Sequence, residues 1–329
     1  MKIWVVLLLA GCFAKHHDDA TPDAGDPAAD AKICGGVQLA LDYVPPNLGI
    51  VLDRSCSMRQ LLTGTQTTKW MAAVAAIDHA LQSYATDVRW GLTLFPDTTG
   101  EACAQDANTV PIDDGKATAI QTLLDASLAT TDPSYPSFPC VTNIDTGIES
   151  AALDPALADP AHRSYLMLVT DGAQSGTCTL GGGDAGTEAA VHALFHDRGI
   201  PTFVVGFGSE ADATELTRLA NKGGVPAQGA TKFYKADTAA DLDAVFQQIA
   251  NQVVSCTYAV DQVPPDLDQT YVVFDHNQLV PRDPTHMMGW DFDPATMTFT
   301  MYGGYCDALK SHAVADIGIT FGCPNPPIL

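Results

Sequence analysis

The chain has 329 residues, with 39 acidic and 16 basic side chains and a formal net charge of −23 at pH 7. This excess of negative charge opposes binding to nucleic acid and to anionic lipid surfaces, because both are themselves negatively charged. Hydrophobic residues make up 46% of the sequence and are spread along it, so a buried core is expected. The length predicts one α/β domain and a smaller module, at about 100–200 residues per domain.

The first residues, MKIWVVLLLAGC, predict an export signal. One lysine precedes an apolar run that is too short to span a bilayer as a stable helix. The end of this run, Leu9-Ala10-Gly11-Cys12, resembles the bacterial lipobox, in which the signal is cut before the cysteine and the thiol carries lipid. The resemblance implies a signal peptide at 1–11 and a lipid anchor on Cys12 in the cell envelope, preferably at the outer membrane because Phe13 follows. The alternative is an ordinary signal peptide with a buried or paired Cys12.

Residues 12–33 predict a flexible tether, because they are rich in Ala, Asp and Pro and lack apolar periodicity. After the tether, short apolar runs alternate with amphipathic segments, which is typical of a mostly parallel sheet wrapped by helices. Strands are expected at 47–52, 88–95, 109–112, 165–170 and 202–207. Helices are expected at 71–84, at 117–128, from 145 onward, at 188–198 and after residue 238.

Two of these helices have clear signals. The first places apolar residues three and four apart, on one face: Met71, Val74, Ile77, Leu81 and Tyr84. The last begins with Thr238 and Asp241, which resemble a capping box, and continues with a buried stripe of Leu242, Val245, Phe246, Ile249 and Val253. The α/β domain is therefore expected to span 34–256.

Residues 257–329 predict a small β module, because alternating runs replace helical periodicity beyond Cys256. Its aromatic residues form either a small core, which is preferred, or a binding face for sugar or protein: Trp290, Phe292, Phe299, Tyr302 and Tyr305.

Eight cysteines remain after Cys12, an even number that predicts four disulfides in an exported chain. Cys34 and Cys256 flank the α/β region, and Cys306 and Cys323 share the C-terminal module, so each pair is an expected bridge. The other four leave the pairing open, with Cys56–Cys140 and Cys103–Cys178 preferred.

Oxygen-bearing side chains follow the expected strands. Asp53, Ser55 and Ser57 alternate after the first strand, Thr142 lies ahead of a helix, and Asp171 follows another strand. Because open α/β sheets bind ligands at the carboxyl ends of their strands, we expect these side chains to converge. Hydroxyl and carboxylate oxygens suit a hard cation, so Mg²⁺ is expected, with Mn²⁺ or Ca²⁺ as substitutes.

This arrangement resembles the von Willebrand factor type A family, which includes integrin I domains. The metal-ion-dependent adhesion site of that family combines Asp-x-Ser-x-Ser, a distant Thr and a strand-end Asp. The resemblance covers about residues 47–254 and implies a doubly wound, mostly parallel, Rossmann-like α/β fold followed by the small β module. It assigns five metal ligands: Asp53, Ser55, Ser57, Thr142 and Asp171.

Two details of the resemblance concern single positions. Thr142 is assigned in preference to Thr146, because the threonine of the family lies six residues before the first apolar residue of the next helix, here Ile148. Cys56 replaces the glycine that is common between the two serines. If Cys56 is bridged to a cysteine of another metal loop, large loop shifts are not expected.

The resemblance implies a function in binding. A divalent ion with only two acidic side chains around it keeps positive character, and in the family it recruits a carboxylate from a partner. We therefore expect cation-dependent adhesion to a protein or glycan at the cell envelope, with membrane contact through the lipid anchor only and no nucleic acid. The alternative is a structural envelope protein whose metal site is degenerate or secondary and whose C-terminal β module is the binding part.

Catalytic motifs are lacking in the sequence. There is no Gly-x-Ser-x-Gly, and the run of 181–183 lacks the Lys and Ser/Thr of a phosphate-binding loop. His192 and His196 are four residues apart but do not belong to a His-Glu-x-x-His sequence. We therefore expect no enzymatic activity.

Overall fold

The computed structural model describes residues 37–98, 102–106, 108–208, 211–311 and 313–322. The predicted signal peptide at 1–11, the lipidated Cys12 and the tether at 12–33 lie outside the described residues. Within the described ranges, no helix is both long enough and apolar enough to cross a membrane.

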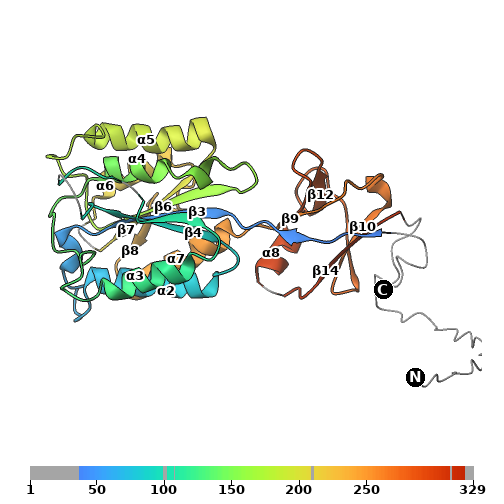
Figure 1. The fold of residues 1–329 in the computed structure, drawn as a ribbon, viewed down its shortest axis with the longest axis horizontal. Coiled ribbons are helices and arrows are strands. Elements are labelled where there is room, and N and C mark those ends of the chain that lie inside the picture. The colour runs from blue at the N-terminus through green and yellow to red at the C-terminus, as the bar shows by residue number, and fades with distance from the viewer. Residues whose placement is uncertain (1–36, 99–101, 107, 209–210, 312, 323–329) are drawn as a thin grey trace, which may run out of the picture. The chain divides into compact units, whose positions relative to one another are not determined.

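A six-stranded sheet with the order β5-β4-β3-β6-β7-β8 forms the centre of the α/β part (Figure 1). All neighbouring strands are parallel except β5, which runs antiparallel to β4. The strands are β3 (Asn47–Asp53), β4 (Arg89–Phe95), β5 (Val110–Asp113), β6 (Ser164–Thr170), β7 (Thr202–Phe207) and β8 (Tyr234–Ala236). The predicted doubly wound α/β fold class is confirmed. From β3 the chain adds strands toward one edge of the sheet, and from β6 it adds them toward the other edge. The boundary between β3 and β6 is therefore a topological switch point, where such sheets bind ligands.

Helices cover both faces of this sheet (Figure 1). On one face lie α2 (Lys69–Ser83), α3 (Ala117–Ala126) and α7 (Ala239–Val253). On the other lie α4 (Ile144–Ala152), α5 (Gly183–Arg198) and α6 (Ala213–Lys222). Single 3₁₀ turns occur at η1 (Cys56–Arg59) and η2 (Pro155–Ala158).

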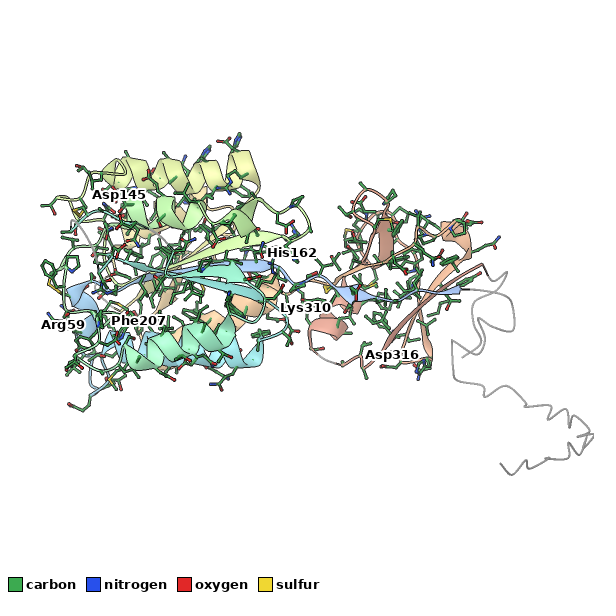
Figure 2. The ribbon with its side chains drawn as sticks, viewed as in Figure 1. Arg59, Asp145, His162, Phe207, Lys310 and Asp316 are labelled. Carbon is green, nitrogen blue, oxygen red and sulfur yellow. A yellow bond between two sulfur atoms is a disulfide. The ribbon has the colours of Figure 1, made fainter. Side chains whose placement is uncertain are left out.

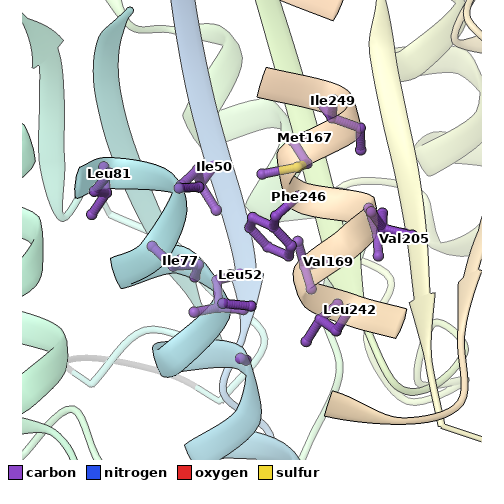
Figure 3. Packing of buried hydrophobic residues seen from close by; sticks show 14 of the residues in the cluster. Ile50, Leu52, Ile77, Leu81, Met167, Val169, Val205, Leu242, Phe246 and Ile249 are labelled. Carbon is purple, nitrogen blue, oxygen red and sulfur yellow. The ribbon is translucent and has the colours of Figure 1, made fainter. Parts of the chain in front are cut away.

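The two faces of β3 bury alternate residues, because successive side chains of a strand point to opposite sides. Ile50 and Leu52 belong to the core beneath α2 and α7, where they lie near Phe246 (Figure 3). Val51 belongs to the separate core on the opposite face. Every residue of β3 is buried, and residues 48–52 form a continuous apolar run, as is usual in the middle of a parallel sheet.

The two helices with clear signals are both present. The capping box of Thr238 and Asp241 is confirmed, and the predicted stripe of α7 is buried. In α2 the predicted residues Val74, Ile77 and Leu81 are buried, but Met71 is 48% exposed. Trp70 is buried instead, and its indole N–H donates to the carbonyl oxygen and hydroxyl of Ser127 at the end of α3.

Several elements were not anticipated, among them α6, β8 and α8 (Gly304–Lys310). The start of α6 does carry a local signal, since the Asp212 carboxylate accepts hydrogen bonds from the backbone N–H groups of Thr214 and Glu215. The helix α8 contradicts the expectation that no helix follows Cys256. It has only seven residues, too few to show a helical period in the sequence.

The remaining strands form two antiparallel sheets, β1-β14-β10-β11 and β12-β13-β9-β2. The first contains β1 (Val37–Gln38), β10 (Thr270–Phe274), β11 (Gln278–Val280) and β14 (Ile317–Phe321), and the turn η3 (Leu267–Gln269) leads into β10. The second contains β2 (Asp42–Tyr43), β9 (Thr257–Ala259), β12 (Gly289–Asp293) and β13 (Thr298–Tyr302).

The described residues divide into two compact units that are discontinuous in sequence, one of residues 37–40, 261–282 and 314–322 and the other drawn from residues 41–260 and 283–313. The chain therefore passes between them four times. This division differs from the predicted domains 34–256 and 257–329. Pairing of β1 with β14 and of β2 with β9 joins the N-terminal segment to strands far along the chain, which no local pattern reveals.

The aromatic residues of the C-terminal region are mainly core. Trp290, Phe292 and Phe299 are buried, and the Phe299 ring lies 5.2 Å from Trp290 and 4.8 Å from Phe292 between centroids. The preferred interpretation as a small core is confirmed for these three rings. Tyr302 is partly exposed and stacks on His286.

The structure pairs Cys56 with Cys140 and Cys103 with Cys178, as preferred from the sequence. It also pairs Cys256 with Cys306, so the predicted Cys34–Cys256 and Cys306–Cys323 bridges are wrong. Cys256 immediately precedes β9 and Cys306 follows β13. Pairing of β9 with β13 brings these two cysteines together. Cys34 and Cys323 lie outside the described residues.

Asp78 of α2 should make the stability of the protein depend on pH. Burial and the nearby charge of Asp125 raise the pKa of Asp78 to about 6. The folded protein thus binds more protons than the unfolded chain between about pH 4 and 6, and stability falls as pH rises through this range. Asp78→Asn should raise the free energy of unfolding at pH 7 by on the order of 1 kcal/mol, allowing for solvent screening, and have little effect at pH 4.

Thermal unfolding at the two pH values measures this difference. Asp261→Asn, which removes one exposed carboxylate, is the matched control for net charge. An Asp78→Asn variant no more stable than the parent at pH 7 would contradict the prediction.

Candidate metal centre

The candidate centre lies at the carboxyl ends of β3 and β6, the two adjacent strands at the switch point. Figure 2 shows Arg59, Asp145 and Phe207 at this end of the sheet and His162 at the opposite end. Asp53 is the last residue of β3, and Asp171 follows the last residue of β6. Their exposed fractions are 0% and 2%, so the two carboxylates are removed from bulk water.

Four of the five predicted ligands lie in one hydrogen-bonded cluster. The Ser57 hydroxyl donates to Asp171 Oδ1 at 2.7 Å, and the hydroxyl oxygens of Ser55 and Ser57 are 2.9 Å apart. The backbone N–H of Ser55 donates to Asp53 Oδ1 at 2.7 Å, and Thr170 Oγ1 donates to Asp53 Oδ2 at 2.7 Å. Alternate positions after β3 thus direct their oxygens toward the end of β6.

Thr142 is held to the loop after β6 through its backbone. It lies ahead of α4, and its N–H donates to Ser175 Oγ at 2.8 Å, while the Ser175 N–H donates to the Thr142 carbonyl oxygen at 2.7 Å. These bonds join the Thr142 loop to the loop that follows Asp171. Among the described residues, no hydrogen bond connects the Thr142 side chain with the other four predicted ligands.

The electrostatics of the cluster are dominated by the two carboxylates. Burial, followed by the nearby charge of Asp171, raises the pKa of Asp53 to about 7. Asp171 has a cationic partner, since Lys69 Nζ lies 2.7 Å from its Oδ2 and both side chains are buried. Lys69 was not identified in the sequence analysis, because nothing local connects the first residue of α2 with the end of β6.

Hydrogen bonds to Asp145 and Glu215 fix the loops around the cluster. The buried carboxylate of Asp145 accepts from the backbone N–H groups of Gly181 and Gly183, both at 3.0 Å, and from Gln174 Nε2 at 2.9 Å. The Gln174 N–H in turn donates to the carboxylate of Glu215. Burial raises the pKa of Glu215. Asp145 therefore holds the loop after β6 against α4.

Two disulfides cross-link the same edge of the sheet. Cys56 lies between Ser55 and Ser57, and its bond to Cys140 joins the loop after β3 to the segment that leads into Thr142. The Cys103–Cys178 bond ties the loop after β4 to the loop after β6. The predicted stiffening of this end therefore has two covalent sources.

Arg54 is a buried residue of the loop that follows β3, and it links this loop to neighbouring segments. Its guanidinium donates to the carbonyl oxygens of Pro96 at 2.8 Å and Phe138 at 2.6 Å. These bonds satisfy part of the guanidinium and hold the Pro-rich segment of 132–139 over the loop.

The donor set fits a hard divalent cation. In the described ranges, no three His, Cys, Asp or Glu side chains gather in a way that could hold a metal ion, so a cation here would depend on the hydroxyls as well as the two carboxylates. Oxygen-only ligands of this kind suit Mg²⁺ better than softer metals. Burial and the nearby charge of Asp171 raise the pKa of Asp53, and a dication beside the two carboxylates would favour their charged forms.

No protein-family model and no curated protein matches the sequence. Among solved structures, the chain is similar to the pilus adhesin SpaC from Lactobacillus rhamnosus GG, with 15% identity over 85% of this chain and 39% of that chain and a TM-score of 0.49. It is also similar to the von Willebrand factor type A structure from Catenulispora acidiphila, with 14% identity over 86% of this chain and 59% of that chain and a TM-score of 0.46.

A third similar structure is proximal thread matrix protein 1 from the mussel byssus, described with a zinc-occupied MIDAS motif. It has 13% identity over 67% of this chain and 50% of that chain, and a TM-score of 0.45. The chain thus spans between 39% and 59% of the length of these three proteins.

The hydrogen bonds of Asp145 should contribute to the stability of the protein. Both carboxylate oxygens of Asp145 accept hydrogen bonds, Oδ2 from the N–H groups of Gly181 and Gly183 and Oδ1 from Gln174 Nε2 and the Thr146 N–H. Asp145→Asn leaves only one acceptor oxygen, so some of these buried donors lose their partner. We expect a loss of about 2–3 kcal/mol in the free energy of unfolding. Denaturant unfolding measures the loss. Asp184→Asn, at an exposed carboxylate in the same segment, should cost much less, and equal losses in the two variants would refute the role given to Asp145.

Proposed function

We propose that this chain is a von Willebrand factor type A-like binding protein that grips a protein or glycan through a divalent cation, with Mg²⁺ as the resident ion and Mn²⁺ or Ca²⁺ as substitutes. The observation that carries the proposal is the joining of Asp53, Ser55, Ser57 and Asp171 in one buried cluster at the switch point of the sheet. Thr142, which hydrogen bonds with Ser175 join to the loop after β6, is the fifth proposed ligand.

The chemistry of the proposed site favours recognition of an anionic group. A dication between two carboxylates retains its Lewis acidity, because the hydroxyl ligands are neutral. When bound, the ion would supply a positive centre for an oxygen of the partner, such as a carboxylate. The residues of this chain hold the ion and exclude water from its inner side.

Binding, and not catalysis, is proposed because the hydroxyls and carboxylates of the cluster are engaged with one another. Ser57 donates to Asp171, and that carboxylate is already ion-paired with Lys69 and accepts on both of its oxygens, which is a poor arrangement for a general base. We further propose that the protein acts at the cell envelope, anchored by a lipid on Cys12, with the outer membrane preferred.

The proposal predicts saturable cation binding that depends on Asp53. Calorimetric titration of Mg²⁺ and Mn²⁺ into the metal-stripped full chain should give saturable heat, and Asp53→Asn should abolish it. Asp53→Asn should nevertheless fold, because it removes the repulsion from Asp171 that helps raise the pKa of Asp53 in the absence of a cation. Its melting temperature without cation should equal or exceed that of the parent.

Surface carboxylates are a source of weak heat in so acidic a chain, so Asp261→Asn is titrated in parallel and should retain the binding. The double variant Ser55→Ala and Ser57→Ala leaves the charge unchanged and should weaken binding at least tenfold, through loss of two ligands. Heat that persists unchanged in Asp53→Asn would exclude this site.

The Cys56–Cys140 disulfide should support cation affinity as well as stability. Replacing both cysteines by alanine should lower the free energy of unfolding by about 4–5 kcal/mol by the loop-entropy rule, given the sequence separation of 84. It should also weaken Mg²⁺ binding several-fold, because the loop after β3 and the segment that leads into Thr142 are then released from each other. The paired alanine variant at Cys256 and Cys306 is the matched control, with a separation of 50 and no cysteine beside a proposed ligand. It should lose stability and keep its cation affinity. Equal losses of affinity in the two double variants would mean that the Cys56–Cys140 disulfide has no specific role at the site.

A further inference from the structure

Lys69 is a charged residue inside the proposed metal centre that the metal-binding function does not use. It is the first residue of α2, yet its side chain extends to the end of β6, where Nζ lies 2.7 Å from Asp171 Oδ2. The exposed fractions of the two side chains are 5% for Lys69 and 0% for Asp171. A buried ammonium carries a large desolvation cost, so its position requires compensation by the carboxylate.

The surroundings of Lys69 are built to accommodate it. Its backbone N–H donates to the Gln60 carbonyl oxygen at 2.9 Å, and Nζ is 3.4 Å from Gln60 Oε1. Gly208, with φ of +90°, lies against the stem of the lysine, and a Cβ at that position would be 2.9 Å from Lys69 Cε. Any larger residue at 208 would therefore crowd the lysine.

Stability of the helix does not account for this lysine. A positive charge in the first turn of α2 is disfavoured by the helix dipole, which favours negative charge at that end. The interaction that Lys69 does make is with a proposed metal ligand. Both oxygens of Asp171 are thereby engaged, Oδ1 by the Ser57 hydroxyl and Oδ2 by Lys69.

We propose that Lys69 is an internal cation that competes with the divalent ion for Asp171. In the metal-free protein it neutralises one of the two buried carboxylates and stabilises the empty site. When a divalent ion binds, its positive charge and that of the ammonium repel each other at close range, so Lys69 lowers the cation affinity. This inference rests on the proposed function, since it assigns a residue that tunes the same site.

The test is the Mg²⁺ affinity of Lys69→Met in the oxidised full chain, measured by calorimetry. Removing a buried charge within a few ångströms of the ion should tighten binding tenfold or more. The same variant should melt at a lower temperature than the parent without cation, and the rise in melting temperature on adding saturating Mg²⁺ should be larger than in the parent. Lys69→Arg, which keeps the charge, should bind more weakly than Lys69→Met.

Lys235→Met is the matched control, because Lys235 is an exposed lysine paired with Asp237 and its loss changes the net charge equally. It should leave the Mg²⁺ affinity unchanged. Should Lys69→Met fail to fold without cation, Lys69→Gln keeps a hydrogen-bond donor beside Asp171 and gives the same comparison.

The outcomes separate the inference from the proposed function. Saturable Mg²⁺ binding of equal or lower affinity in Lys69→Met and Lys69→Gln would overturn the competition while leaving the metal centre intact. Absence of binding in the parent, with binding gained in Lys69→Met, would support Lys69 as the occupant of the site and overturn the function proposed for the natural chain. Absence of binding in every variant would overturn both.

Discussion

Two carboxylates buried at the ends of adjacent parallel strands repel each other, and the surrounding structure compensates for that repulsion. Asp53 and Asp171 are brought together because β3 and β6 pair at the switch point of the sheet. In a site away from water, like charges need nearby donors or cations. The Ser57 hydroxyl and the Lys69 ammonium supply them for Asp171. Asp53 is left with hydrogen bonds alone, from Thr170 and from the backbone of Ser55, and has a pKa near 7.

The loops that carry these groups are held in place before any ligand arrives. The Cys56–Cys140 and Cys103–Cys178 disulfides and the buried carboxylate of Asp145 join segments that come from four different connections of the sheet. A binding surface that is ordered beforehand loses less conformational entropy when a partner docks. The same cross-links oppose large loop movements, so recognition at this edge would depend on the chemistry of the site more than on a change of shape.

Much of the fold could be predicted, because β3, β6 and β7 are continuous apolar runs and α7 has a capping box with an apolar stripe. The meeting of Asp53 and Asp171 could be predicted because each stands where an apolar run of the sequence ends. Lys69 could not, since its partner lies 102 residues further along the chain and no spacing rule connects them. The Cys256–Cys306 bridge could not be predicted for the same reason. It depends on the pairing of β9 with β13, and antiparallel register between distant segments leaves no local signal.

The Cys256–Cys306 bond also determines how the chain carries mechanical load. The bond closes a covalent ring that runs from Cys256 to Cys306. This ring includes segment 261–282, which belongs to the smaller compact unit, and both places where that segment joins the larger unit. When a chain is pulled from points outside such a ring, tension crosses the disulfide directly and the enclosed residues are not stretched. Residues 257–305 would therefore be shielded from force applied along the chain, and β9, β12 and β13 would keep their pairing while other segments extend.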